Sequence, residues 1–490
     1  MSNLSDLLPA GAGGKQVNFV ASGTLSSGQT VGLRSDGKVQ TITSQTGAAT
    51  VFQNSTTIYI SSCFDSSSNK IIIAYTATSN YGFTCVGTIS GSSISFGTPS
   101  AFESATTTYI SANYDSDNDK VVVCFRNSSG YGAAKVGALS GTTVSFPSAA
   151  DVFNSDSTTS ITSTYFSQSG NDGIAVFYRD NGDSSKGNSK IGSISGTSIS
   201  WGTEVNFSSG GSIGNYIDCC YNTTDNTVYV VWQDPSSSNY GQVKIANHSS
   251  YVLSYGGSVT FISDAITYVS ADYDATNNKT VIGYNNNAES NKGFAKVFTS
   301  NTAFGDSKGG VVGSAVSFTT NANANSIDVV CDSGANKTHI AYDDGSDTDK
   351  PKIVTGTVSG DRASATISFT SPVTLASTTG TNYTNAVYDS NANKVVIAYQ
   401  DQGNSNNGTA LTYDQSGFPA SNFVGITDAA ISDTASGSVT IKGGISSNVS
   451  SLTPNATYYV QADGTLATTT STVLAGKALS STSINLDYTT

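Results

Sequence analysis

The stretch TTIYISSCFDSSSNKIIIAYTATSNYGFTCVGTISGSSISFGTPSAF (56–102) is followed by a near copy of itself, TTTYISANYDSDNDKVVVCFRNSSGYGAAKVGALSGTTVSF (106–146). Units of the same kind recur, and each opens on one apolar residue: Phe52, Phe102, Phe153, Phe207, Phe261, Phe318 and Val373. The intervals between them are 50, 51, 54, 54, 57 and 55 residues. A repeat of this length indicates one supersecondary unit copied along the chain, as in a propeller, a solenoid or an array.

A second set of positions gives the same period. In each unit an aromatic residue or Cys precedes Asp, Asn or Ser: Phe64-Asp65, Tyr114-Asp115, Phe166-Ser167, Tyr221-Asn222, Tyr273-Asp274, Cys331-Asp332 and Tyr388-Asp389. Ten residues after each polar member comes another aromatic: Tyr75, Phe125, Phe177, Trp232, Tyr284, Tyr342 and Tyr399. The repeated Asp predicts a turn, because its carboxylate accepts hydrogen bonds from the backbone N–H groups that follow it.

Each unit has the pattern of four short strands. In the first copy, apolar and polar residues alternate over 57–65, 70–76, 82–90 and 93–102, which we name runs A to D. The runs are rich in β-branched and aromatic residues, as strands are, and DSSSNK, SNYG and SGSS separate them as turns. Four strands joined by tight turns form an antiparallel meander, which is the blade of a β-propeller. The sequence therefore predicts an all-β fold with a propeller of seven four-stranded blades.

The last unit predicts how the propeller closes. It supplies strands over 381–389, 394–400 and 409–414, and its pattern then stops. The stretch VQTITSQTGAATVF (39–52) occupies the run-D position ahead of the first unit, so we expect it to complete the last blade and cover an open sheet edge. The predicted domains are an N-terminal arm with a short β segment (1–38), the propeller (39–420) and a small C-terminal β module (421–490).

Composition narrows the range of partners. The formal net charge is −13 and the basic residues are scattered, which disfavours nucleic acid as a partner. No apolar run approaches the roughly 18–20 residues that span a bilayer, so membrane insertion is not expected. The start of the chain, MSNLSDLLPAGAGGK, lacks the basic and apolar regions of a secretory signal peptide.

The two ends of the chain resemble known proteins. The tail contains Phe423-Val424-Gly425, Leu452-Thr453-Pro454, Tyr458-Tyr459-Val460, Asp463-Gly464 and Gly476-Lys477-Ala478-Leu479-Ser480. It resembles a C-terminal module of tailed-bacteriophage fibre and other virion proteins, and the opening of the chain is similar to the starts of virion proteins from marine phages. The resemblance covers roughly 120 residues, and Asn455 stands where that module usually has Gly. It implies a virion component that is assembled in the host cytoplasm, contacts other virion proteins and forms a homo-oligomer in the particle.

Candidate ligand-binding residues lie in the turns between runs B and C. These turns differ from unit to unit, whereas the A–B and C–D turns are uniform and rich in Ser, Asn and Gly. Variable loops on a rigid scaffold are where binding sites usually lie. The side chains that suit a glycan are Tyr81, Tyr131, Tyr240, Asp180, Asp234, Asp344 and Asp401. A tyrosine ring can stack on the C–H face of a sugar while carboxylates bind its hydroxyls; alternatively, the tyrosines cover the edges of their own blades.

The sequence contains no recognisable catalytic constellation, metal site or cofactor motif. We therefore expect a non-enzymatic virion protein of the tail-fibre or surface-adhesin type, which contacts host-surface polysaccharide or neighbouring virion proteins. One alternative is a capsid decoration or tail component without a receptor role. The other is a polysaccharide depolymerase, which needs two carboxylates about 5–10 Å apart; Asp180 and Asp234 are the candidates.

Overall fold

The computed structural model describes residues 15–43, 45–168, 172–301, 309–319, 323–418, 420–461, 464–471 and 473–487. The chain divides into two compact units, Ala48–Tyr413 and a unit made of Met1–Gly47 with Asp414–Thr490. This division differs from the predicted boundaries at 38/39 and 420/421. The predicted arm up to residue 14 and the turn residue Asp463 lie outside the described residues. No helix within the described residues is long and apolar enough to cross a membrane.

The unit that contains both chain ends has two antiparallel sheets of five strands each. The first has the order β1 (Gln16–Val20), β38 (Ser436–Ile441), β37 (Phe423–Thr427), β2 (Thr30–Leu33), β3 (Val39–Thr41). The second has the order β39 (Ile445–Ser446), β43 (Ile484–Leu486), β42 (Leu474–Ala478), β40 (Thr457–Val460), β41 (Leu466–Ala467). The N-terminal β segment and the C-terminal module, predicted as separate domains, therefore share the first sheet.

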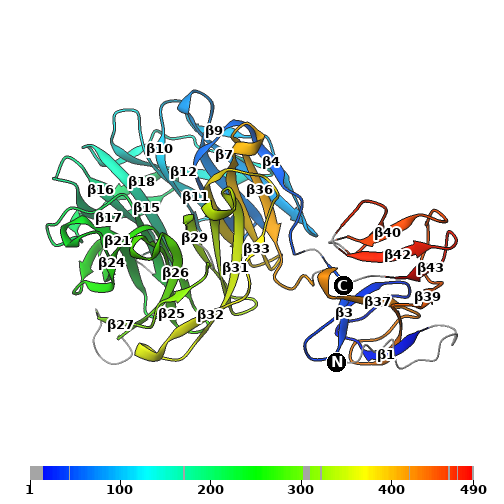
Figure 1. Ribbon diagram of the computed structural model, residues 1–490. Helices are drawn as coiled ribbons and strands as arrows, with labels where there is room; N and C mark the ends of the chain where they lie inside the picture. The colour runs from blue at the N-terminus through cyan, green and yellow to red at the C-terminus, as the bar shows by residue number, and fades with distance from the viewer. Residues whose placement is uncertain are drawn as a thin grey trace. The chain divides into compact units, whose positions relative to one another are not determined.

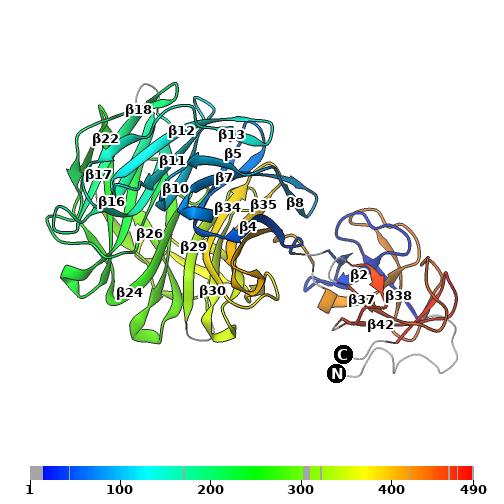
Figure 2. The same ribbon diagram turned by 90° about the horizontal axis from the view of Figure 1, so that it is seen from above.

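The unit over 48–413 consists of antiparallel sheets that follow the sequence repeats (Figures 1 and 2). Run A of each repeat forms one strand: β5 (Ile58–Asp65), β10 (Thr108–Asp115), β15 (Thr158–Phe166), β20 (Ile217–Asn222), the second half of β24 (Val259–Asp274), β29 (Ala324–Asp332) and β34 (Thr381–Asp389). Run B forms the next: β6 (Lys70–Thr76), β11 (Lys120–Arg126), β16 (Gly173–Asp180), β21 (Thr227–Asp234), β25 (Lys279–Asn286), β30 (Lys337–Asp344) and β35 (Lys394–Asp401). Run C forms the third: β7 (Gly82–Ser90), β12 (Gly132–Ser140), β17 (Lys186–Ser195), β22 (Tyr240–Ser249), β26 (Lys292–Ser300), β31 (Lys350–Ser359) and β36 (Asn407–Tyr413).

Run D departs from the prediction of a single strand. In the first repeat it is broken into β8 (Ser93–Phe96) and β9 (Ser100–Glu103), and both pair with β7. The same division gives β13 (Thr143–Ser145) with β14 (Asp151–Asn154), β18 (Ser198–Trp201) with β19 (Val205–Asn206), β27 (Gly310–Val312) with β28 (Val316–Ser317), and β32 (Thr366–Phe369) with β33 (Val373–Thr374). In the fourth repeat the second piece continues after β23 (Val252–Tyr255) into β24, which joins two neighbouring sheets into one of nine strands.

The first strands of successive sheets contact one another in chain order. β5 contacts β10, β10 contacts β15, and the series continues through β20, β24, β29 and β34. β34 then contacts β5, so the series of contacts returns to its start. A strand from near the N-terminus completes the sheet of β34, β35 and β36: β4 (Thr50–Thr56) pairs antiparallel with β36, beside which it lies in Figure 1. The pairing strand is thus 50–56, whereas 39–41, inside the predicted stretch 39–52, forms β3 and pairs with β2 in the other unit.

The repeated aromatic residues meet in the core. The residue that opens a unit packs on the aromatic ring at the end of run B, as in Phe52 with Tyr75, where the ring centroids are 5.1 Å apart. The third repeat corrects the sequence alignment, because Phe153 packs on Tyr178 at 5.1 Å and not on Phe177. The strand pairing agrees, since Phe166 faces Gly173 where Asp65 faces Lys70. The A–B turn of the third repeat, between Phe166 and Gly173, is longer than that of the first repeat, between Asp65 and Lys70. The sequence alignment therefore placed residues of the third repeat one position away from their structural equivalents.

The Asp residues that follow run A cap the A–B turns, as predicted. Asp65 Oδ1 accepts hydrogen bonds from the N–H groups of Ser67 and Ser68, both at 2.9 Å. Asp115, Asp274, Asp332 and Asp389 accept backbone N–H groups at the equivalent places. Their recurrence is therefore explained by turn formation rather than by chemistry.

Candidate functional site

The B–C turns and the starts of the first strands lie at the same end of the sheets. In the first sheet, Ile58 at the start of β5 pairs with Thr76 at the end of β6, and Thr76 also pairs with Gly82 after the turn. The same register holds in the other sheets, so the B–C turns and the starts of run A form one face of the 48–413 unit. We call it the B–C face.

The three predicted tyrosines occupy equivalent positions on this face. Tyr81, Tyr131 and Tyr240 each precede the glycine at the start of run C. Tyr81 and Tyr131 are exposed, with 37% and 38% of their surface accessible, and Tyr240 is half-buried. The first two therefore present free aromatic surface.

The four predicted aspartates hold their own turns together. Asp234 and Asp344 cap short 3-10 turns, η3 (Pro235–Ser237) and η6 (Gly345–Asp347), by accepting the N–H groups of Ser236 and Ser346. Asp401 caps η8 (Gln402–Asn404) in the same way, and Asp180 accepts the N–H groups of Gly182 and Asp183. Asp344 also pairs with the Lys352 ammonium at 2.7 Å.

Each of the two carboxylates proposed for hydrolysis is bonded within its own turn. Asp180 and Asp234 lie in the turns of neighbouring sheets, and each is bonded to backbone groups of its own turn. Each of these carboxylates already accepts hydrogen bonds from N–H groups of its own turn. Within the described residues, no group of three or more His, Cys, Asp or Glu side chains is arranged to hold a metal ion.

A set of tyrosines that the sequence did not single out lies at the starts of run A, on the B–C face. The strand register aligns six residues of run A with Tyr216, which directly precedes run A of its repeat, and we call this set the mouth row: Tyr59, Tyr109, Ser160, Tyr216, Tyr268, Ser326 and Tyr383. The four tyrosines within run A have φ values between 47° and 54°, and the two serines have φ of 50° and 44°. Positive φ is costly for a bulky residue, and such backbone is commonly found at binding and active sites.

The mouth row forms two groups of aromatic rings. Tyr59 contacts Tyr109 at 5.1 Å and Tyr383 at 5.5 Å between ring centroids. Tyr216 contacts Tyr268 at 4.9 Å. Ser160 and Ser326 occupy the two positions between the groups, so two aromatic walls alternate with two gaps. All five tyrosines are half-buried.

The hydroxyls of Tyr59 and Tyr268 are neutral in this setting. Burial, followed by the neighbouring Tyr109 and Tyr383, raises the pKa of Tyr59 to about 12. Burial, followed by Tyr216 and the carboxylate of Asp343, raises the pKa of Tyr268 to about 12. A neutral phenol can both donate and accept a hydrogen bond, so the mouth row offers polar groups at the edge of an aromatic surface.

Two residues further along the same strands lies a second row, which we call the bridging row: Ser61, Ser111, Thr162, Asp218, Ser270, Asp328 and Asn385. Its side chains connect neighbouring sheets. Ser61 Oγ accepts the N–H of Ala112 at 3.0 Å, and Asp218 Oδ2 accepts the N–H of Ala271 at 2.9 Å. These bonds join first strands that do not pair by backbone hydrogen bonds.

The bridging row requires a bound proton. Ser270 Oγ accepts the N–H of Val329 at 3.1 Å, and lies 2.9 Å from Asp218 Oδ2 and 3.0 Å from Asp328 Oδ1. A hydroxyl donates one hydrogen bond only, so one of the two carboxyl groups must carry a proton to make the second bond. Asp328 is the candidate, because burial and then the Asp218 carboxylate raise the pKa of Asp328 to about 8.

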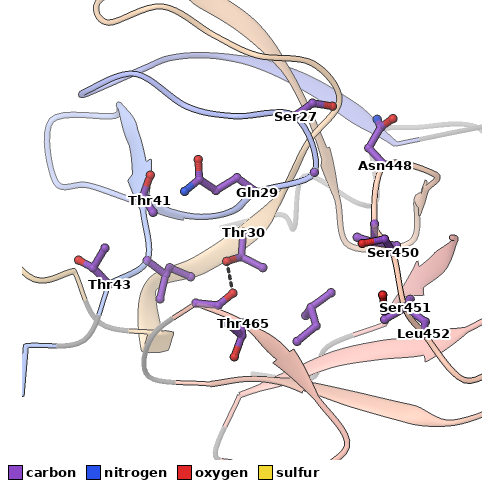
Figure 3. Close-up of a pocket in the computed structure, with 15 residues that line it drawn as sticks. Ser27, Gln29, Thr30, Thr41, Thr43, Asn448, Ser450, Ser451, Leu452 and Thr465 are labelled. Carbon is purple, nitrogen blue, oxygen red and sulfur yellow. Dashed lines mark hydrogen bonds between the residues drawn. The ribbon is translucent and has the colours of Figure 1, made fainter. Parts of the chain in front are cut away.

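The unit that contains the chain ends has a recess of its own, with a volume of about 640 Å³. Figure 3 shows hydroxyl and amide side chains around it, among them Gln29, Thr41, Asn448 and Ser450. Thr30 donates a hydrogen bond from its hydroxyl to the carbonyl of Gly464 at 2.5 Å at its edge. None of the described residues that line the recess is charged or aromatic. A smaller recess of about 320 Å³ lies on the B–C face of the other unit, between Ser55 and Asn80.

No protein-family model and no curated protein matches this chain. Among solved structures, the chain is similar to the SapL1 lectin in complex with alpha methyl fucoside, at 10% identity over 62% of this chain and 94% of the lectin, with a TM-score of 0.38. It is similar to a mutant of AofleA from Arthrobotrys oligospora, at 9% identity over 70% of this chain and 94% of the other, with a TM-score of 0.39. It is also similar to Trypanosoma rangeli sialidase in complex with sialic acid, at 10% identity over 84% of this chain and 60% of the sialidase, with a TM-score of 0.35.

Proposed function

We propose that residues 48–413 form a closed seven-bladed β-propeller that binds carbohydrate through its B–C face. Two observations support the closed ring: the first strands contact one another in a series that returns from β34 to β5, and β4 completes the sheet of β36. In such a ring the first strands surround the central axis and the mouth row surrounds one opening of the channel.

The observation that carries carbohydrate binding is the mouth row. Five tyrosines from five repeats stand at one register position, next to the most variable turns of the chain. Aromatic rings stack on the C–H faces of sugars, and their hydroxyls bind sugar hydroxyls. Tyr81 and Tyr131 on the neighbouring turns extend the aromatic surface outward.

We propose that this protein acts by binding and not by catalysis. The carboxylates that a depolymerase would use, Asp180 and Asp234, are engaged in capping separate turns. Glycoside hydrolysis needs one carboxyl that can give up a proton and a second that acts on the same sugar. Turn capping in separate sheets meets neither condition.

The particle role rests on the resemblance of the two chain ends to phage virion proteins. We propose a tail-fibre or surface adhesin whose propeller contacts host polysaccharide and whose other unit contacts neighbouring virion proteins. The alternative is a capsid decoration or tail component that binds only other virion proteins. The two roles differ in a single property, which is binding to the host surface.

The test is binding of the purified chain to intact bacteria and to their extracted surface polysaccharides, with reducing ends assayed in the same tubes. Binding without new reducing ends is the expected result. New reducing ends that disappear in Asp180→Asn or Asp234→Asn would establish a depolymerase instead. Absence of binding across a broad panel would favour the assembly role.

A further inference from the structure

Two arginines lie at the end of run B on neighbouring sheets, next to the mouth row. Arg126 pairs with Thr108, the residue before Tyr109, and Arg179 pairs with Thr159, the residue before Ser160. Arg126 therefore lies in the sheet of Tyr109 and Arg179 in the next sheet, that of Ser160, both at the B–C face. The chain has only four arginines in all.

The contacts of Arg126 place its side chain against the B–C turn of its own repeat. Its Nε lies 3.4 Å from the carbonyl of Gly130 in the B–C turn, and a Cβ added at Gly130 would be 3.3 Å from its Nη2. Its charge also reaches the aromatic wall, because the Arg126 guanidinium acts to lower the pKa of Tyr59 against the dominant effect of burial.

Arg179 leaves donor capacity unused. Its Nη1 donates to Asn215 Oδ1 at 2.9 Å, next to Tyr216, and its buried Nε has no hydrogen-bond partner within the described residues. Ser160 is 5% exposed and its hydroxyl also lacks a partner among those residues. None of the ion pairs formed by the described residues includes Arg126 or Arg179.

The gap at Ser326 has the opposite character. Asp343 lies at the run-B position equivalent to the two arginines, and the hydroxyls of Thr381 and Thr384 donate to its Oδ1. Its Oδ2 is buried and has no hydrogen-bond partner in the described part of the chain. The mouth is therefore basic at one gap and acidic at the other, with tyrosine walls between them.

We propose that the mouth row binds a sugar residue that carries a carboxylate, with this carboxylate held by Arg126 and Arg179. The inference rests on the proposed carbohydrate binding and adds the class of sugar. A guanidinium binds a carboxylate through two parallel N–H···O bonds, and such charge-assisted bonds are stronger than neutral ones. The tyrosine walls hold the faces of the ring, and Asp343 disfavours the reversed orientation because it would face the ligand carboxylate.

The test compares an acidic oligosaccharide with the same oligosaccharide after chemical reduction of its carboxyl groups, using uronate-containing and sialate-containing probes as separate arms. Binding to the full chain is measured by calorimetry. We expect the acidic form to bind at least about tenfold more tightly, because a hydrogen bond to a charged group contributes more than a neutral one. Arg126→Gln and Arg179→Gln should each remove most of this preference, and Arg126→Lys should keep part of it.

Arg362→Gln is the matched control, because Arg362 lies in η7 (Arg362–Ser364), between run C and run D of its repeat, and not on the B–C face. It should bind like the wild type. Equal binding of acidic and reduced probes, with loss in Tyr59→Ala, would overturn the acidic-sugar proposal and leave carbohydrate binding intact. Absence of binding to every carbohydrate would overturn both.

A fold check makes these outcomes interpretable. Both tryptophans of the chain, Trp201 and Trp232, lie in the 48–413 unit. An arginine variant whose tryptophan fluorescence and thermal unfolding match the wild type has lost binding and not structure. If Arg126→Gln and Arg179→Gln keep the full preference for the acidic probe while folded, the assignment of the two arginines is wrong.

Discussion

The mouth row and the bridging row lie two residues apart on the same seven strands, yet their side chains are engaged in opposite ways. In the bridging row nearly every polar group is used within the protein, as in Asp218, which accepts hydrogen bonds from Thr162, Cys219, Ala271 and Ser270. In the mouth row the backbone has positive φ at every position except Tyr216, and the tyrosine rings contact one another. The bridging row therefore joins the first strands, and the mouth row is the one for which we propose ligand binding.

The comparison is tested most strongly at Asp218. Asp218→Ala leaves several donors between the sheets without their acceptor, and we expect a loss of about 2 kcal/mol or more in the free energy of unfolding. Urea unfolding followed by tryptophan fluorescence measures this. Ser61 is the equivalent residue of the first repeat. Ser61→Ala removes one acceptor and should lower the free energy of unfolding by about 1 kcal/mol. Equal effects of the two variants would mean that the carboxylate has no special role in the bridging row.

The bound proton predicts a dependence of stability on pH. The pKa of Asp328 is raised in the folded state above its ordinary value, so its contribution to stability is present at low pH and is lost as pH rises toward about 8. The free energy of unfolding should fall by about 1 kcal/mol per pH unit between pH 6.5 and 8.

Asp328→Asn is the control for this slope. The amide keeps the shape of the carboxylic acid and does not titrate, so the slope over the same range should disappear. The half-buried His248 affects both proteins equally: burial lowers the pKa of its ring in the folded state, and the substitution does not change this. A slope that is the same in Asp328→Asn would assign the proton to another group.

Substitutions in the mouth row should weaken carbohydrate binding and change stability little, whereas those in the bridging row should lower stability. Tyr109→Gly removes a half-buried ring but also relieves a backbone held at φ 52°, so we expect the free energy of unfolding to change by less than about 1 kcal/mol. Carbohydrate binding should fall about tenfold. A large loss of stability with unchanged binding would show that the tyrosine walls are structural.

The smallest effects are expected at the outer tyrosines. Tyr81→Ala and Tyr131→Ala remove exposed rings, so stability should change by less than about 0.5 kcal/mol. Binding to cells should weaken a few-fold, less than in the mouth-row variants. If these two variants bind more weakly than Tyr109→Gly, the site lies on the turns and not at the mouth.

Much of the strand order could be predicted from the repeats. Alternation, turn residues and the recurrence of Phe52 and its equivalents predict the strands of runs A to C within a few residues. The errors fall where the local pattern is ambiguous: run D is two strands, and the third repeat is shifted because Phe177 and Tyr178 are adjacent aromatics. Run 39–52 has a strand pattern throughout, and only pairing partners decide that its two ends belong to different sheets.

Less of the candidate site than of the strand order could be predicted from the sequence. The turns between runs B and C stood out because they vary, but their aspartates are turn caps. The mouth-row tyrosines were visible in the sequence as members of an alternating strand, where an aromatic residue is expected for packing alone. Nothing local indicates that residues about 50 positions apart, such as Tyr59 and Tyr109, come into contact, since that follows from the arrangement of the sheets.

By itself, the sequence determined the repeat, the strand pattern of each unit and the Asp-capped turns, because these depend on neighbours within a few residues. The tertiary structure decided which strand completes the last sheet, that the two chain ends share a unit, and that tyrosines and buried carboxyl groups gather along the first strands with two arginines on the strands beside them. Those properties arise from contacts between residues far apart in the chain, where desolvation and the pairing of charges depend on every sheet at once.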